Sequence, residues 1–169
     1  MAAPKEGLAE GRDGATPLAV QRCADVARAR ELHAFTQGIF GALDIDPPSS
    51  VLKESAADFA ARLARETAFI IEADGALIGS VFCARKDDAL YIGRLAVAPA
   101  WRRRGVASAL VEAAKAEARR CALARLTLGA RIALAGNVAL FRRHDFVVVR
   151  QTCHPGFVTP TSYDMELRL

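Results

Sequence analysis

"RLAVAPAWRRRGVASALVEAAKAEARR", residues 94–120, holds the most informative pattern of the chain. An apolar run ends at Pro99, arginines fill positions 102–104, and an alanine-rich stretch follows Gly105. In that stretch apolar residues recur at the spacing of an amphipathic helix: Val106, Ala109, Leu110, Ala113 and Ala114. Glu112, Lys115, Glu117 and Arg119 fall mostly off this stripe. The segment predicts a strand, a turn and a helix in direct succession.

The start of this helix is suited to bind an anion. The first turn of a helix has free N–H groups, and the peptide dipoles add about half a positive charge there. Gly105 lets a ligand approach the backbone closely, and Ala107 and Ser108 keep the next positions small. Hydrogen bonds to a charged group contribute roughly 1.5–3 kcal/mol each, so about three or four amides would give micromolar binding. We expect the amides to carry the binding and the arginines to assist; the alternative is a solvated charge run before a surface helix.

The rest of the chain predicts one α/β domain over residues 17–169, after a disordered lead-in at 1–16. The predicted order is β-α-α-β-β-β-α-β-α-β-β, with a mixed, mostly antiparallel, twisted sheet of about six or seven strands flanked by about four helices. Strands are expected at 16–23, 67–85 (a hairpin turning at Asp74-Gly75), 89–97, 124–130, 146–152 and 162–169. Helices are expected at 24–43, from near Ser55, at 105–122 and at 136–145.

Composition excludes several function classes. The chain has 169 residues, 52% of them hydrophobic, which is enough for a core. No window of about eighteen apolar residues predicts a membrane span, and no apolar region follows the N-terminal charges as in a secretory signal. The four scattered cysteines favour a reducing cytosol over a disulfide framework or a metal site. The net charge of +4 permits nucleic acid as a partner, but no aromatic-interleaved basic patch favours it. We expect a cytoplasmic protein without a metal, and the sequence leaves a homodimer open.

Residues 102–107, Arg-Arg-Arg-Gly-Val-Ala, match the pattern Gln/Arg-x-x-Gly-x-Gly/Ala, whereas no Walker-type or Gly-x-Gly-x-x-Gly loop is present. With the hairpin before it and "GNVALFRRHDF" (136–146) after it, the chain resembles the GNAT superfamily of acyl-CoA-dependent N-acyltransferases over residues 17–169. The resemblance implies acetyl-CoA as co-substrate and an amine as acceptor.

The resemblance also implies where acetyl-CoA would bind. The strand before the loop splays from its neighbour, and Leu95, Ala96 and Val97 would offer main-chain groups to the pantetheine arm. The Leu95 N–H would polarise the thioester carbonyl. The pyrophosphate would lie on the loop and the helix start, at Arg102, Arg103, Arg104, Gly105, Val106, Ala107 and Ser108. Asn137 would contact the arm, with a helix N-cap as the alternative, and Phe141 would lie beside the cofactor.

Two positions depart from the family pattern. Tyr91 stands where several relatives carry an acidic base, and a phenol with a pKa near ~10 is a poor base at neutral pH. Tyr91 could instead bind substrate, order a water or pack against the helices. Phe141 replaces the usual tyrosine that protonates the thiolate, although a thiol of pKa near ~8.5 leaves tolerably without it. Asp145 replaces a usual glycine, and a turn residue tolerating left-handed φ accounts for it.

Three histidines are candidate bases, each with a structural alternative. His154 ranks first, because the connection between the last two strands borders the acceptor pocket in this family. His33 lies on the first helix, and His144 follows two arginines on an expected solvated helix face. In the segment 44–56, the family's acceptor-recognition region, Ser49, Ser50 and Lys53 could read a carboxylate or phosphate, or belong to a flexible loop.

The predicted function is transfer of an acetyl group from acetyl-CoA to a primary amine of a small molecule, protein or peptide, with Leu95, Tyr91 and His154 as catalytic residues. The reaction needs an amine deprotonated, an oxyanion stabilised and a thiolate released. The departures at Tyr91 and Phe141 keep open a non-catalytic acyl-CoA-binding domain, and the basic excess keeps open an acetyltransferase acting on aminoacyl-tRNA.

Overall fold

Seven strands form one sheet, in the order β1-β2-β3-β4-β5-β7-β6, in the computed structural model, which describes residues 18–169. The strands span Val20–Cys23 (β1), Thr67–Ala73 (β2), Ala76–Lys86 (β3), Ala89–Val97 (β4), Arg125–Arg131 (β5), Val147–Thr152 (β6) and Ser162–Arg168 (β7). The helices span Ala29–Gly41 (α1), Ala56–Arg65 (α2), Val106–Arg120 (α3) and Ala135–Arg143 (α4). Short 3-10 turns cover Val26–Arg28, Ser50–Lys53 and Pro99–Trp101.

The predicted element order and the mixed, mostly antiparallel sheet are confirmed. Every neighbouring pair of strands is antiparallel except β4 and β5, which run parallel across the connection through α3. The predicted lead-in, residues 1–16, lies outside the described residues, so it and the domain start at residue 17 stay predictions.

Local sequence signals set several element boundaries. Asp74 and Gly75 have φ angles of 50° and 76°, as a tight hairpin turn between β2 and β3 requires. Ser55 and Asp58 form a capping box at the start of α2. The single helix predicted over 24–43 is wrong at its start: a 3-10 turn covers 26–28, and Val26 is 47% exposed.

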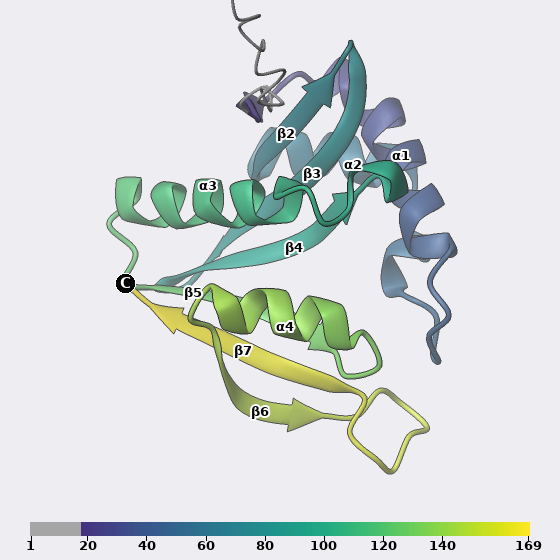
Figure 1. Ribbon diagram of the computed structural model, residues 1–169, viewed down its shortest axis with the longest axis vertical. Coiled ribbons are helices and arrows are strands. Elements are labelled where there is room, and N and C mark those ends of the chain that lie inside the picture. The colour runs from purple at the N-terminus through teal and green to yellow at the C-terminus, as the bar shows by residue number, and fades with distance from the viewer. Residues whose placement is uncertain (1–17) are drawn as a thin grey trace, which may run out of the picture.

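The helices cover both faces of the sheet, with α3 and α4 on one side and α1 and α2 on the other (Figure 1). The larger core lies under α3 and α4 and includes Leu110, Val111 and Leu126. The smaller core lies under α1 and α2 and includes Leu32, Phe59 and Phe82. Each such buried side chain contributes roughly 1.5–3 kcal/mol, so both faces are fixed against the sheet.

Glu117 of α3 is buried, although the apolar stripe predicts otherwise; Lys115 is buried too. The Glu117 carboxylate accepts hydrogen bonds from Arg120 at 2.8 Å, from the Thr67 hydroxyl at 3.0 Å, and from Arg22. The Arg120 hydrogen bond is the main cause that lowers the pKa of Glu117 to about 2, against the opposing effect of burial. The prediction was wrong here because partners from β1 and β2 compensate the buried charge.

This carboxylate should make stability depend on pH. The folded-state pKa of Glu117 is about 2 against an ordinary 4.5, so its stabilisation is complete above pH 4.5 and is lost as pH falls toward 2. Glu117→Gln should lower the free energy of unfolding at pH 7 by on the order of 1–3 kcal/mol and flatten its decline below pH 5, measured by urea unfolding. Asp87→Asn, in an exposed turn, removes a charge as a control and should keep the wild-type slope. An unchanged slope in Glu117→Gln would contradict the argument.

Candidate functional site

The two parallel strands at the centre of the sheet separate part-way along their length. Pairing between β4 and β5 covers only Ala89–Ile92 with Arg125–Leu128. Beyond it, β4 continues to Val97 and β5 to Arg131 without pairing to each other. Figure 1 shows the halves of the sheet diverging away from the C-terminus. The edge of β4 that faces this split carries main-chain groups able to bind an extended ligand as a strand would.

A bulge in β4 lies at the split. Phe82 of β3 pairs with Gly93, and Ser80 pairs with Ala96, so the register shifts between them. Within the bulge Arg94 has a φ of 55°, a conformation that non-glycine residues seldom adopt. The predicted splay of this strand is therefore present, and it has a local backbone cause.

An ion pair from a distant segment holds Arg94. Its Nε donates to Glu54 Oε2 at 2.7 Å and its Nη2 donates to Glu54 Oε1. Arg62 of α2 donates to the same carboxylate at 2.5 Å. Burial acts to raise the pKa of Glu54, but the hydrogen bonds and charges of the two arginines outweigh it and lower the pKa below its ordinary value. Glu54 is thus ionised, and its ion pair with Arg94 links the α1–α2 connection to β4.

The start of α3 presents its N–H groups without partners. Gly105 is the N-cap with a φ of 83°, and no side chain caps the helix. Within the described chain, no protein acceptor is found for the N–H groups of residues 103–108, and the first bond of the helix runs from Ala109 N to Gly105 O at 2.9 Å. The amides are therefore arranged as an anion site requires.

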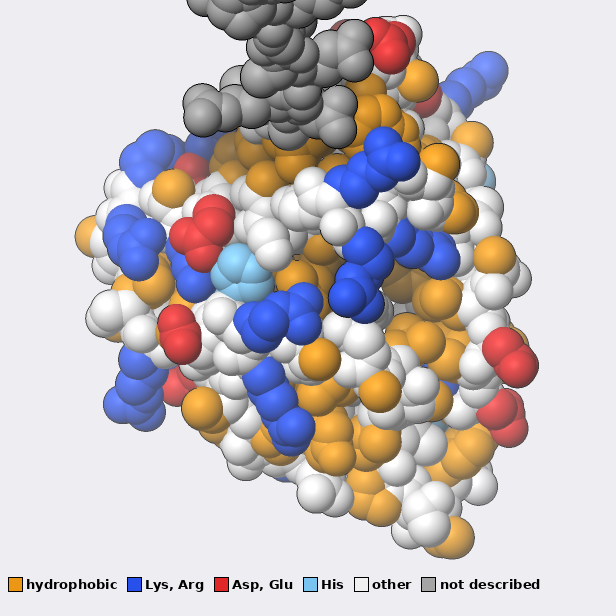
Figure 2. Space-filling model, viewed as in Figure 1, with side chains coloured by type: hydrophobic (Ala, Val, Ile, Leu, Met, Phe, Trp, Pro, Cys, Tyr) orange, Lys and Arg blue, Asp and Glu red, His pale blue; other side chains and the backbone are white. Residues whose placement is uncertain are grey.

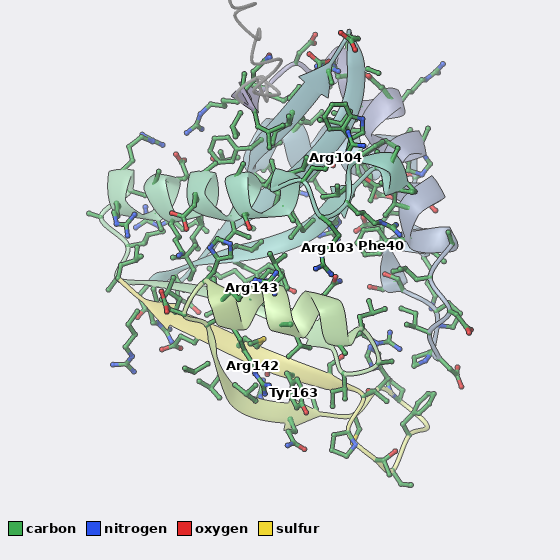
Figure 3. All side chains as sticks on the ribbon, viewed as in Figure 1. Phe40, Arg103, Arg104, Arg142, Arg143 and Tyr163 are labelled. Carbon is green, nitrogen blue, oxygen red and sulfur yellow. The ribbon has the colours of Figure 1, made fainter. Side chains whose placement is uncertain are left out.

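The arginines before α3 lie around this site. Arg102, Arg103 and Arg104 are exposed and form no ion pair with a described residue. Arg104 instead packs its guanidinium over the Trp101 ring, 5.2 Å from the centroid. Figure 2 shows Lys and Arg side chains gathered across this face, and Figure 3 shows Arg103 and Arg104 at the loop and Arg142 and Arg143 on α4. This face attracts anions.

A model of the acetyltransferase (GNAT) family matches residues 29–146. The chain belongs to this family. Among curated proteins, none matches the sequence significantly.

Solved structures of GNAT proteins share the fold. The PaiA N-acetyltransferase of Thermoplasma acidophilum, in complex with coenzyme A, has a TM-score of 0.74 and 11% identity over 90% of this chain and 100% of its own. YncA of Salmonella typhimurium, with acetyl-CoA, has a TM-score of 0.70 and 19% identity over 90% and 94%. The ribosomal-protein-S18-alanine N-acetyltransferase of Escherichia coli has a TM-score of 0.65 and 20% identity over 89% and 94%.

His144 of this GNAT chain is not on a solvated helix face, so that expectation was wrong. Its side chain is 12% exposed and lies between α3 and α4. The ring Nε2 is 3.0 Å from the Ser108 hydroxyl, and Nδ1 is 3.0 Å from Glu112 Oε1. The imidazole therefore orients Ser108, one of the residues predicted to bind the pyrophosphate. Sequence reasoning missed this contact because 36 residues separate the two positions.

Asn137 and Phe141, the two residues of α4 predicted to contact the cofactor, differ in exposure. Asn137 is exposed, and its backbone N–H donates to Leu134 O at 2.9 Å. It is not the N-cap, which is Leu134, so that alternative was wrong and cofactor contact stays a prediction. Phe141 is 6% exposed and its ring packs edge-on against Phe146, with centroids 5.8 Å apart. The structure gives Phe141 a packing role, and its contact with the cofactor also stays a prediction.

Tyr91 lies on the sheet face covered by α1 and α2. Lys86 Nζ is 3.9 Å from the centroid of the Tyr91 ring. The Tyr91 hydroxyl lies over Gly129, where an added Cβ atom would be 3.6 Å from it. The side chain borders two hollows on either side of it. One, of about 210 Å³, is also lined by Arg62, Glu66, Phe82, Ala84, Lys86, Gly93 and Arg94. The other is lined by Thr127, Leu128, Val149, Arg150, Asp164 and Met165. Tyr91 is placed to contact a molecule bound on this face.

Of the other histidines, His154 stays a candidate base and His33 does not. His154 is half-buried, and its Nδ1 is 2.5 Å from Thr161 Oγ1. Burial, and then the charge of Arg131, lower the pKa of His154 below 6.5, so the ring is neutral at pH 7. His33 Nε2 lies 2.8 Å from the Glu54 carbonyl oxygen, to which it donates, and its ring packs on Phe59. His33 supports the α1–α2 connection.

Other predicted features have structural roles or stay open. Ser49 caps the 3-10 turn of 50–53 by accepting from Val51 N at 3.3 Å, whereas Ser50 and Lys53 are exposed. The cysteines are all free; burial raises the pKa of Cys83 to about 12, and Cys153 is exposed. Over residues 18–169, no three His, Cys, Asp or Glu side chains gather as metal ligands, and no helix has the length and apolarity to cross a bilayer.

The Arg94 conformation gives a direct test of the bulge. Arg94→Gly removes the ion pair but tolerates the positive φ, whereas Arg94→Ala removes the pair and keeps a strained Cβ. Both variants should be less stable than the wild type, and the Gly variant should exceed the Ala variant by roughly 0.5–1 kcal/mol in urea unfolding. Both should bind acetyl-CoA more weakly in calorimetry, because the split loses its support. Equal or greater stability of the Ala variant would show that the backbone strain is not held at this residue.

Proposed function

We propose that this protein transfers an acetyl group from acetyl-CoA to a primary amine. The observation that carries the proposal is the split between β4 and β5, whose open edge leads to the free amides at the start of α3. Membership of the acetyltransferase (GNAT) family supports it. Two proteins of similar fold, which were solved with acetyl-CoA or coenzyme A, support the same co-substrate.

The residues present fit the co-substrate. The main-chain groups of Leu95 and Val97 face the split, where an extended arm would pair with them, because Ala98 N donates to Ile78 O of β3 and main-chain direction alternates along a strand. Ala96, between them, pairs with Ser80 of β3 and would contribute through its position beside the arm. The N–H groups of residues 103–108 would receive the pyrophosphate, and the absence of a Cβ at Gly105 leaves room for it. The Ser108 hydroxyl, oriented by His144, adds a polar group at the same place.

The amine nitrogen would form a bond to the acetyl carbon as the carbon–sulfur bond breaks. The Leu95 N–H would stabilise the negative charge that develops on the carbonyl oxygen. Phe141 has no proton to give, so the sulfur would leave as a thiolate, which a thiol pKa near ~8.5 permits.

We propose that His154 accepts the proton that the amine loses and that Tyr91 contacts the acceptor. Burial and the Arg131 charge lower the pKa of His154, which favours the neutral imidazole. Its Nδ1 contacts Thr161, which precedes Ser162, the partner of Arg131 at the end of β5. Glu54 is less suited to this task, because two arginines saturate its carboxylate and lower its pKa. Tyr91 borders both hollows on the sheet face covered by α1 and α2, which is called the acceptor face from here on. Its hydroxyl can donate or accept a hydrogen bond there.

Binding of acetyl-CoA should depend on the backbone at Gly105 more than on the arginine side chains. Gly105→Glu adds bulk and a negative charge beside the amides, and it should abolish binding measured by calorimetry. Gly105→Ala bears the same strain at a φ of 83° without the charge, so it serves as the matched control and should retain weakened binding. Arg103→Ala should weaken binding by less than about tenfold, the equivalent of about 1.4 kcal/mol.

Circular dichroism of each variant is the control, and it should show the spectrum of the folded wild type. If Arg103→Ala proves as damaging as Gly105→Glu, the amides do not dominate the site.

Turnover should be visible as thiol release from acetyl-CoA over a broad panel of amines. His154→Gln should lower kcat at pH 7 by about 10²–10⁴-fold with little change in acetyl-CoA affinity, as expected for loss of a general base. Tyr91→Phe, which removes only the hydroxyl, should mainly raise the KM of the amine. A silent panel with tight acetyl-CoA binding would contradict the enzyme and favour a binding domain, whereas full activity in His154→Gln would contradict the assignment of the base.

A further inference from the structure

Arg131 is the exception among the half-buried arginines of the described chain. Arg28, Arg62, Arg94 and Arg125 each have a carboxylate oxygen within 3.1 Å. Over residues 18–169 no carboxylate lies within ion-pair distance of Arg131. Its Nε is buried without a hydrogen-bond partner, as is that of Arg62, but the other guanidinium nitrogens of Arg62 are bonded to carboxylates. Leaving a buried donor unsatisfied costs about 1–3 kcal/mol, and more for a charged group, so this guanidinium requires an explanation.

The side chain of Arg131 belongs to the acceptor face of the sheet. Side chains alternate along a strand, and Leu126, Leu128 and Ala130 are in the core under α3 and α4. Position 131 therefore faces the other side, together with Thr127 and Gly129, where Tyr91 also lies. The charge of Asp46, in the connection between α1 and α2, acts on the guanidinium from that side.

Arg131 also lies across the split from Leu95. The last paired residues of the two parallel strands are Ile92 and Leu128. Leu95 lies three residues beyond Ile92, and Arg131 lies three residues beyond Leu128. The rise is about 3.3 Å per residue in regular strand, and the bulge at Arg94 shortens it on β4, so Leu95 lies at or just below the height of Arg131 above the last pair. A molecule whose amine reaches the carbonyl bound at Leu95 is then within reach of the guanidinium.

We propose that Arg131 binds a carboxylate of the acceptor, so that the substrates of this enzyme are amines that carry a carboxylate near the reacting nitrogen, as free amino acids do. The proposal rests on the acetyl transfer inferred above and names its substrate class. A guanidinium and a carboxylate form paired hydrogen bonds in one plane, which fixes the orientation of the acceptor as well as holding it.

The surroundings of Arg131 suit a bound zwitterion. Burial lowers the pKa of Arg131, partly offset by the Asp46 charge, yet an arginine stays charged in proteins. Asp46 acts on Arg131 through its charge alone, because the two side chains form no ion pair. A bound carboxylate would compensate the Arg131 charge that disfavours protonation of His154. Anchoring the acceptor would thereby make His154 a better proton acceptor.

The test compares amino acids with the amines left by their decarboxylation, for example phenylalanine with phenethylamine. Rates of thiol release should give a kcat/KM about 10- to 100-fold higher for the acids, as expected for charge-assisted hydrogen bonds. Arg131→Gln should remove this preference, mainly through the KM of the acids, and Arg131→Lys should keep part of it. Acids no better than amines in the wild type, or an unchanged preference in Arg131→Gln, would overturn the proposal.

Two controls separate binding from structure. Arg119→Gln removes an exposed arginine at the far end of α3 and should leave the preference at its wild-type value. Arg131→Gln should unfold at the same urea concentration as the wild type or a higher one, because it removes an uncompensated buried charge. An Arg131→Gln variant that is clearly destabilised would show that the residue is structural instead.

Failure of the proposed function leaves a separate readout. If no amine is acetylated, calorimetry of the coenzyme A-loaded protein compares N-acetyl amino acids with the corresponding N-acetylated amines. Binding of the acids alone, lost in Arg131→Gln, supports the carboxylate site although acetyl transfer fails. Equal binding of both classes, or binding of neither, overturns the site.

Discussion

The pair of Arg94 and Glu54 is the constraint on which the site depends. A sheet gains hydrogen bonds by pairing its central strands along their whole length, so an opening between β4 and β5 requires a compensating interaction. The bulge at Arg94 turns β4 away, and Glu54 holds the strained residue from the α1–α2 connection. Arg62, His33 and Gln37 fix Glu54 in turn. One carboxylate thereby couples the acceptor side of the fold to the strand that would hold the thioester.

The split divides the chemistry between two faces of the sheet. The α3 and α4 face offers backbone amides and exposed arginines, which suit a highly charged ligand and tolerate side-chain variation. The opposite face offers Tyr91 and Arg131, and His154 follows from the β6–β7 connection; all three are half-buried and come from separate segments. In the proposed reaction, a ligand that passes through the split would meet backbone amides and arginines on one face and particular side chains on the other. The thioester and the amine would then be selected by separate sets of residues.

The sequence predicts the fold well, because its signals are local. The Asp74-Gly75 turn, the Ser55 capping box and the stripe of α3 each fix an element within a few residues, and the free amides after Gly105 follow from the same reasoning. The failures involve pairing at a distance. Glu117 is buried by partners on β1 and β2, His144 is held by Ser108 and Glu112, and Arg94 depends on a residue 40 positions earlier. No periodicity or spacing encodes such contacts.

The same distinction explains why the acceptor is harder to infer than the co-substrate. Backbone amides at a helix start bind phosphate whatever side chains follow, so a short pattern suffices to find them. A side chain that recognises an acceptor has no such pattern, and it is found in the folded protein as a polar group that lacks a charge or hydrogen-bond partner. Arg131 satisfies this criterion, because the fold gives the other half-buried arginines a carboxylate and leaves this one without a described partner. An unpaired charge opposes folding, and it is retained most readily where a bound ligand supplies the opposite charge. The proposed substrate recognition therefore lies at the end of β5, at Arg131.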